Sequence, residues 1–447
     1  MWLRPALLCL ALALALGCGG RRHRNPDVIL IVMDTTRADH LGVYGYSRPT
    51  TPRIDAFARE AAVYTHAWST ASWTLPAHAS LLTGLYVTAH GAHIRPDLDQ
   101  DSLGKNPAHL VQGVTTLAEL LAKQGYRTAA FAGAGWLDPS FGLLQGYEVQ
   151  DARNLRDIRA EELIRRALAW IDTVPEGTPI HLLLNLFDPH GPYNPPKGYD
   201  RFTSGPQPPP IPPDQRKDLS KLAEVYAKNL AWARARYDGE ILYTDDQIGR
   251  FLDALRARGR YQNTLIVITA DHGEAFGEKG AIGHGAWLYE ADLHIPLLVR
   301  RPGGHRRAPR VESLVSIVDV AGIVAEETGI RLPAGVNTLP VGQRSLLLAE
   351  EMPSALFRKR KGLDRDLVAA IRWPWKVIVN LPGKAELYRL DTDPQEKTNL
   401  ADGQRETALV RSLREELAAL KPPASEGPAP PMRPELRERL RELGYLE

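Results

Sequence analysis

The sequence predicts an α/β fold with a mostly parallel central sheet. Two wholly apolar runs, Val28–Met33 and Leu265–Ile268, are typical of strands that are buried on both faces. Helix-like patterns alternate with strand-like runs through most of the chain, which favours helices on both faces of that sheet. Beyond residue 345 short strand-like runs follow, which predict a small C-terminal α+β subdomain with an antiparallel sheet.

Local signals define the elements of the larger part. Thr51 and Pro52 are typical of a helix N-cap and first helical position, and Thr116 with Glu119 forms a capping box. In chain order we expect a helix from Pro52 to about Ala62, a helix from near Pro76 to Gly84, a helix from Thr116 to Gly125, a strand at Thr128–Ala132, a helix at Glu161–Ile171, a strand at His181–Leu186 and a long helical pattern at Leu219–Arg258.

The C-terminal part has its own pattern. The Pro-rich run Gly205–Pro213 suits neither a helix nor a strand, so we expect a surface excursion before the last long helix. The subdomain is expected to contain strands at Val368–Ile371, Lys376–Asn380 and Glu386–Leu390, followed by helices at Glu406–Leu420 and Pro434–Leu443.

Composition excludes several classes of protein. The chain has 447 residues, 44% of them hydrophobic and 24% charged, which is ordinary for a globular protein with a substantial core. Lys and Arg total 55 against 53 acidic residues, so the sequence gives no basic footprint for nucleic acid. We therefore expect no nucleic-acid partner.

Residues 1–18 predict export. A short positive region at Arg4 precedes apolar Ala6–Leu16, which is too short to span a bilayer and is typical of a signal peptide. Cys18 lies in a segment that resembles a bacterial lipobox, with Leu16 one place off the usual position. We expect a lipid anchor on Cys18, a linker over residues 19–26, and a cell-envelope lipoprotein that is periplasmic or membrane-anchored. A plain signal peptide is the alternative.

Two carboxylates end the two apolar strands. Asp34 follows the first strand, and Asp271 with His272 follows the second. Strand ends at the carboxyl edge of an open α/β sheet line the ligand crevice, so these side chains are expected to meet there. Each acid alone is more often a helix cap or a polar strand end. Together with an imidazole they suit one divalent ion, either calcium, manganese or zinc.

Several motifs in one order resemble the sulfatase family of the alkaline phosphatase superfamily. They are Val32–Thr35 with Asp39–Gly42, Thr74–Pro76 with Leu81–Gly84, Phe187–Tyr193, Asp271–Glu274, and Glu386–Tyr388 with Asp393–Leu400. The resemblance implies an alkaline-phosphatase-like three-layer sandwich over residues 27–345, with a C-terminal subdomain over 346–447. It also implies a hydrolase of sulfuric or phosphoric esters in which Asp34, Asp271, His272 and the nucleophile hold the metal ion.

Thr74 stands where the family carries the Cys or Ser that becomes formylglycine, so no formylglycine can form here. A hydroxyl at a helix N-terminus beside a cation can serve as a nucleophile, and Thr74 is therefore the expected catalytic residue. An N-cap threonine without a catalytic role is the alternative. A threonine ester must be cleaved at sulfur or phosphorus, which favours phosphate esters or diesters over sulfates.

Three histidines are expected to contact the substrate. His78 replaces the family's Arg, and Ala134–Trp136 replaces a Lys-Trp-His sulfate clamp, which removes two cations. His190 matches a substrate-binding histidine of the family, and His284 lies where relatives have a Lys that protonates the leaving group. We expect His284 or His190 to assist the leaving group.

Other designs remain open. Asp188 with His190 or His284 could hold a second metal ion. An envelope transferase of the phosphoglycerol or phosphoethanolamine type, in which an alcohol replaces water as acceptor, is one functional alternative. A catalytically silent binding protein on the same scaffold is another.

Overall fold

The structure is a computed structural model that describes residues 25–93, 109–152, 158–204, 208, 219–304, 309–352, 366–381, 385–401, 408, 411 and 412. The expected signal segment and lipobox lie outside these residues, as does nearly all of the Pro-rich run. The two C-terminal helices also lie outside them, apart from residues 408, 411 and 412. No helix within the described ranges is long and apolar enough to cross a bilayer.

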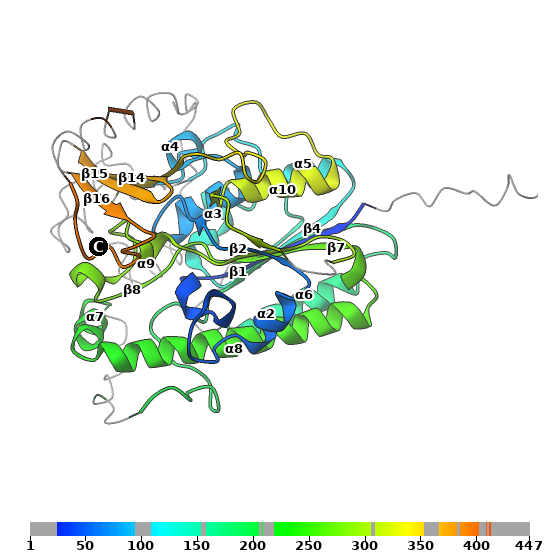
Figure 1. Cartoon of the computed structure of the whole chain (residues 1–447). Coiled ribbons are helices and arrows are strands. Elements are labelled where there is room, and N and C mark those ends of the chain that lie inside the picture. Colours follow the sequence, from blue (N-terminus) through cyan, green and yellow to red (C-terminus); the bar gives the residue numbers. More distant parts are fainter. Residues whose placement is uncertain are drawn as a thin grey trace, which may run out of the picture.

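The centre of the molecule is an eight-stranded, mostly parallel sheet (Figure 1). β1 pairs in parallel with β6 and β7, whereas β10 runs antiparallel to both of its neighbours. The strand order is β11 (Arg310–Val311), β2 (Ala62–Tyr64), β10 (Leu297–Arg300), β7 (Thr264–Thr269), β1 (Asp27–Met33), β6 (Ile180–Leu186), β4 (Arg127–Ala132) and β5 (Val149–Asp151).

Helices cover both faces of the sheet because its central strands are apolar on both sides. Alternate residues of β1 point to opposite cores, so Val28, Leu30 and Val32 face one helical layer and their neighbours face the other. One layer contains α3 (Thr74–Thr83), α5 (Leu117–Lys123) and α10 (Asp319–Thr328), and the other contains α2 (Pro52–Phe57), α6 (Ala160–Ile171) and α8 (Leu230–Ala257) (Figure 1). The predicted three-layer α/β fold is confirmed.

Three helix boundaries differ from the predictions. α2 ends at Phe57 rather than near Ala62, because Ala62–Tyr64 pairs with β10 and β11 as strand β2. α3 begins at Thr74, two residues before Pro76. Proline fits there because the first amides of a helix need no intrahelical acceptor. The long helical pattern divides at Asn229 into α7 (Leu219–Lys228) and α8.

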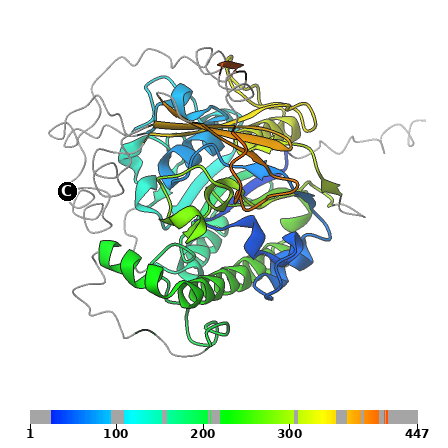
Figure 2. The same ribbon diagram turned by 60° about the vertical axis from the view of Figure 1, so that its left-hand side comes forward.

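The C-terminal subdomain contains the predicted antiparallel sheet (Figure 2). Its order is β13 (Leu347–Glu351), β14 (Asp366–Arg372), β15 (Trp375–Leu381) and β16 (Ala385–Arg389). β13 was not expected from the sequence, because its two glutamates obscure a strand pattern. Ser72 Oγ donates to Glu351 Oε2 at 2.5 Å, so β13 contacts the loop before α3. The remaining short elements are β3 (Ala67–Trp68), α4 (Val87–His90), β8 (Ala275–Phe276), β9 (Ile282–Gly283), α9 (Glu290–Leu293) and β12 (Val315–Ser316).

Candidate active site

Three of the four expected metal ligands meet at the carboxyl edge of the central sheet. Asp34 follows β1, while Asp271 and His272 follow the neighbouring strand β7. One ligand atom from each of the three lies within 4.8 Å of the other two, and all three side chains are fully buried. Adjacent parallel strands explain how residues more than 230 positions apart come together.

Each carboxylate is fixed by hydrogen bonds to one oxygen, and its other oxygen accepts no hydrogen bond from the described residues. Asp34 Oδ2 accepts a hydrogen bond from Asn185 Nδ2 at 2.9 Å. Asp271 Oδ1 accepts from the backbone amides of Thr35 at 3.1 Å and His272 at 2.9 Å. Asp34 Oδ1 and Asp271 Oδ2 are buried, and neither has a hydrogen-bond partner among the described residues. Two such oxygens beside an imidazole fit a divalent cation.

The electrostatics of this cluster also suit a cation. Burial and the nearby Asp271 carboxylate raise the pKa of Asp34 well above its ordinary value, and burial raises the pKa of Asp271. Burial lowers the pKa of His272 well below its usual range, so its imidazole is neutral, as a metal ligand must be. A bound positive ion would offset the unfavourable burial of both carboxylates.

Thr74 lies at the edge of the same cluster as the first residue of α3. Its side chain is 1% exposed, and its Oγ1 is 3.5 Å from His272 Nε2. Trp73 is the N-cap residue of α3, and no side chain makes a capping hydrogen bond there. The alternative of Thr74 as an N-cap is therefore wrong, and its hydroxyl is not used to cap the helix.

His78 lies one helical turn beyond Thr74 and is fully buried. Its Nδ1 is 2.9 Å from the Thr74 carbonyl oxygen, and its Nε2 is 3.4 Å from Asn185 Nδ2. Nδ1 is also 3.5 Å from Asp271 Oδ2. Burial lowers the pKa of His78, so a neutral imidazole packs behind the candidate nucleophile.

His284 and His190 extend the row of imidazoles away from His272. The ring centroids of His272 and His284 are 4.6 Å apart, and those of His284 and His190 are 4.9 Å apart. His190 Nδ1 is 2.7 Å from the Gly191 carbonyl oxygen, and burial lowers the pKa of His190 to about 3. A neutral His190 suits a hydrogen-bonding role better than a proton-donating one at neutral pH.

Two positioning side chains were not singled out from the sequence. Glu274 Oε1 is 3.0 Å from His284 Nδ1, and Glu274 Oε2 accepts from the Tyr193 hydroxyl at 2.8 Å. Asn185 orients Asp34, and its Oδ1 accepts from the Ala134 amide at 3.0 Å. A polar residue near the end of the largely apolar strand β6 was the available signal for Asn185.

Asp188 does not belong to the cluster of Asp34, Asp271 and His272. Its Oδ2 accepts from the Ala160 amide at 2.9 Å, and its Oδ1 is 3.3 Å from Arg159 Nη1. The group of described residues that could hold an ion includes neither Asp188 nor His190. Asp188 is therefore held by the start of α6 and by Arg159.

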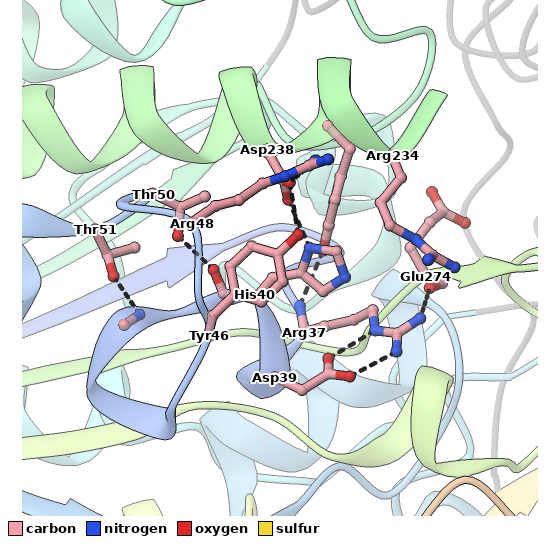
Figure 3. A network of polar contacts seen from close by, with 12 residues as sticks. Arg37, Asp39, His40, Tyr46, Arg48, Thr50, Thr51, Arg234, Asp238 and Glu274 are labelled. Atoms are coloured by element: carbon pink, nitrogen blue, oxygen red, sulfur yellow. Dashed lines mark hydrogen bonds and ion pairs between the residues drawn. The ribbon is translucent and has the colours of Figure 1, made fainter. Parts of the chain in front are cut away.

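A polar network supports the loops behind the cluster (Figure 3). The Arg37 guanidinium forms two hydrogen bonds with Asp39 and donates to the Glu274 carbonyl oxygen at 3.1 Å. It also donates to Glu278 at 2.8 Å. Arg37 therefore ties the loop after β1 to the loop after β7.

Comparisons with known proteins identify a family that this chain resembles. A model of the sulfatase family matches residues 26–330. The uncharacterized sulfatase YidJ of Escherichia coli is 25% identical over 444 residues, covering 85% of this chain and 84% of that protein. The human N-sulphoglucosamine sulphohydrolase is 30% identical over 372 residues, covering 78% and 70%.

Solved structures show the same fold. The phosphonate monoester hydrolase of Agrobacterium radiobacter aligns with a TM-score of 0.67 at 22% identity, covering 88% of this chain and 95% of that one. The phosphonate monoester hydrolase of Silicibacter pomeroyi aligns with a TM-score of 0.66 at 20% identity, covering 88% and 95%.

Proposed function

The chain belongs to the sulfatase family, and we propose that it hydrolyses phosphate esters or diesters through a covalent ester on Thr74. It is a hydrolase of sulfate or phosphate esters. The observation that carries the proposal is the Thr74 hydroxyl, which lies at the start of α3 and 3.5 Å from His272 Nε2. Asp34, Asp271, His272 and Thr74 would hold one divalent ion.

The proposed reaction has two displacements at phosphorus. A bound divalent ion supplies positive charge that favours the Thr74 alkoxide and offsets charge on the transferring oxygens. Thr74 Oγ1 attacks phosphorus as the bond to the leaving alkoxide breaks, and His284 gives that alkoxide a proton. Water then attacks phosphorus, His284 takes back a proton, and the Thr74 oxygen leaves. Glu274 holds the His284 ring through Nδ1, which orients the imidazole for proton transfer.

Two features support phosphate over sulfate. Thr74 cannot become formylglycine, so sulfate cannot be expelled by collapse to an aldehyde. Burial lowers the pKa of His78, so this residue is neutral where the family has Arg. Ala134–Trp136 contains no cation. Phosphoryl transfer needs little beyond positioning and charge stabilisation, which this arrangement offers.

The proposed location is the cell envelope. A signal peptide over residues 1–18 and a lipid on Cys18 would place the catalytic domain outside the inner membrane. Detergent-phase partitioning of the natural chain and a Cys18→Ser variant tests the anchor. The anchor predicts that the natural chain enters the detergent phase and the variant does not.

Nitrophenyl sulfate, phosphate, phosphodiester and phosphonate esters test the activity, each assayed with and without chelator and added metal ions. We expect faster turnover of a phosphate ester or diester than of the sulfate, and loss of turnover in chelator. Thr74→Ala should lose on the order of 10³-fold or more in kcat, whereas Thr74→Ser should retain measurable activity. Thr83→Ala, at the other end of α3, is the control. Full activity of Thr74→Ala would contradict the nucleophile assignment.

A further inference from the structure

The turn after β1 holds a strained residue that contacts the metal cluster. Thr35 has a φ of 54°, in the left-handed region that β-branched residues rarely adopt. In this conformation its amide donates to Asp271 Oδ1 at 3.1 Å. Because that oxygen is occupied, Asp271 Oδ2 is the one left without a hydrogen bond. Together with the His272 amide, which donates to the same oxygen at 2.9 Å, the strained turn therefore leaves Asp271 Oδ2 as the oxygen available to a cation.

The hydroxyl of a tyrosine in α8 forms hydrogen bonds with both ends of this turn. Tyr237 lies in α8 and is fully buried. Its hydroxyl donates to the Thr35 carbonyl oxygen at 2.7 Å and accepts from the Arg37 amide at 2.9 Å. Arg37 in turn donates to the Glu274 carbonyl oxygen at 3.1 Å (Figure 3). Tyr237 thus supports both the turn after β1 and, through Arg37, the loop after β7.

We propose that Tyr237 is a positioning residue whose hydroxyl holds the strained Thr35 turn and thereby orients Asp271 toward the metal ion. This inference rests on the metal site of the proposed function. Gly can adopt a positive φ without strain, so a glycine at position 35 should need the hydroxyl less.

The contacts of Tyr237 separate its hydroxyl from its ring. The ring packs against Tyr193 and Phe276, with centroids 5.6 and 5.0 Å away. A phenylalanine keeps these ring contacts and removes only the hydroxyl that touches residues 35 and 37. Burial raises the pKa of Tyr237 well above its ordinary value, which keeps the hydroxyl protonated as a donor.

Calorimetric titration of metal-free protein with Mn²⁺ tests the proposal without any hydrolysis assay. Tyr237→Phe should weaken Mn²⁺ binding by about 10–100-fold, as loss of a side chain that supports a metal ligand typically does. In a Thr35→Gly background the same change should weaken binding by less than about threefold. Tyr226→Phe is the matched control, because Tyr226 is also buried and its hydroxyl accepts from the Tyr193 amide at 3.1 Å.

The outcomes separate the two proposals. Unchanged Mn²⁺ affinity in Tyr237→Phe, in a protein whose wild type binds Mn²⁺ and hydrolyses esters, overturns the positioning role and leaves the function standing. If Tyr237→Phe weakens Mn²⁺ binding equally in the wild-type and Thr35→Gly backgrounds, the positioning role is also overturned. A wild type that binds no divalent ion overturns the metal site and the positioning role together. If Tyr237→Phe alone fails to fold, recovery of folding and Mn²⁺ binding in the double variant supports the role, and failure of that recovery overturns it.

Discussion

Asn185 links three groups around the candidate metal site without adding charge. Its Nδ2 donates to Asp34 Oδ2 at 2.9 Å and is 3.4 Å from His78 Nε2, while its Oδ1 accepts from the Ala134 amide. The amide is thereby held from both ends. These contacts fix the orientation of the Asp34 carboxylate. Its Oδ1, which accepts no hydrogen bond, is then directed toward the cluster.

Removal of the Asn185 side-chain amide should weaken metal binding more than it destabilises the fold. We expect Asn185→Ala to lower Mn²⁺ affinity by about 10–100-fold, because Asp34 would lose its orienting donor. Calorimetric titration measures the affinity, and Asn229→Ala, at the start of α8, is the control. Affinity equal to that of the wild type would contradict the role of Asn185.

The sequence could predict that the candidate ligands lie close together, but not which side chains support them. Asp34, Asp271 and His272 were expected to meet because they follow strand ends, which converge in this class of fold, and Thr74 was identified from its place in a family motif. The contact of Asn185 with Asp34 depends on the register that pairs Val32 with Asn185. The role of Thr35 depends on a backbone angle. Neither the register nor the angle can be deduced from residue spacing.

At the scale of elements, the loop after β7 is packed too closely for a side chain at Gly273. A Cβ there would collide with the Ala291 carbonyl oxygen and lie 3.0 Å from Arg37 Cγ. The Gly273 amide also donates to the Asp292 carbonyl oxygen at 2.7 Å. The backbone of residues 291 and 292 and the Arg37 side chain leave the loop little room to relax, so the position of the loop fixes Asp271 and His272.

Gly273→Ala should therefore displace the two ligands. We expect at least a tenfold loss of Mn²⁺ affinity and a loss of thermal stability, whereas Gly113→Ala should leave Mn²⁺ affinity unchanged. Gly113 has a positive φ of 88°, which Gly273 does not, and no atom lies within 4 Å of a Cβ placed at Gly113. Equal Mn²⁺ affinity in the two variants would show that the loop tolerates a side chain.

Apolar runs predicted the central strands well, since β1 and β7 are buried along their whole lengths. The elements that were predicted wrongly form through pairing with strands distant in the sequence. Residues 62–64 belong to β2 because β10 and β11 lie beside them, although the local pattern continues the helix. Similarly, β13 is a strand because it pairs with β14.

At the scale of the whole molecule, buried neutral histidines make folding sensitive to acid. His181 is fully buried in β6, where its Nε2 is 2.8 Å from the Tyr147 hydroxyl. Burial lowers its pKa to about 4 from the ordinary 6.5. The unfolded chain therefore binds a proton that the folded chain does not, and stability falls as the pH drops from about 6.5 to about 4.

His181→Gln should reduce this pH dependence. A shift of this size corresponds to roughly 3 kcal/mol of stability lost across the window. Urea unfolding at pH 7.5 and pH 4.5 measures the difference in unfolding free energy, which should be smaller in His181→Gln than in the wild type. His109→Gln, at a half-buried position, should leave it unchanged. If the unfolding free energy changes equally between the two pH values in the wild type, His181→Gln and His109→Gln, the role of His181 in acid sensitivity is contradicted.

The proposed site brings side chains from three separate segments around one cation, with the Thr74 hydroxyl beside it. Anomalous diffraction from crystals grown with Mn²⁺ measures whether an ion binds there. We expect one strong peak about 2.0–2.6 Å from oxygen or nitrogen atoms of Asp34, Asp271, His272 and Thr74. A crystal with no peak among these residues, or with the Thr74 hydroxyl beyond about 4 Å from the peak, would contradict it.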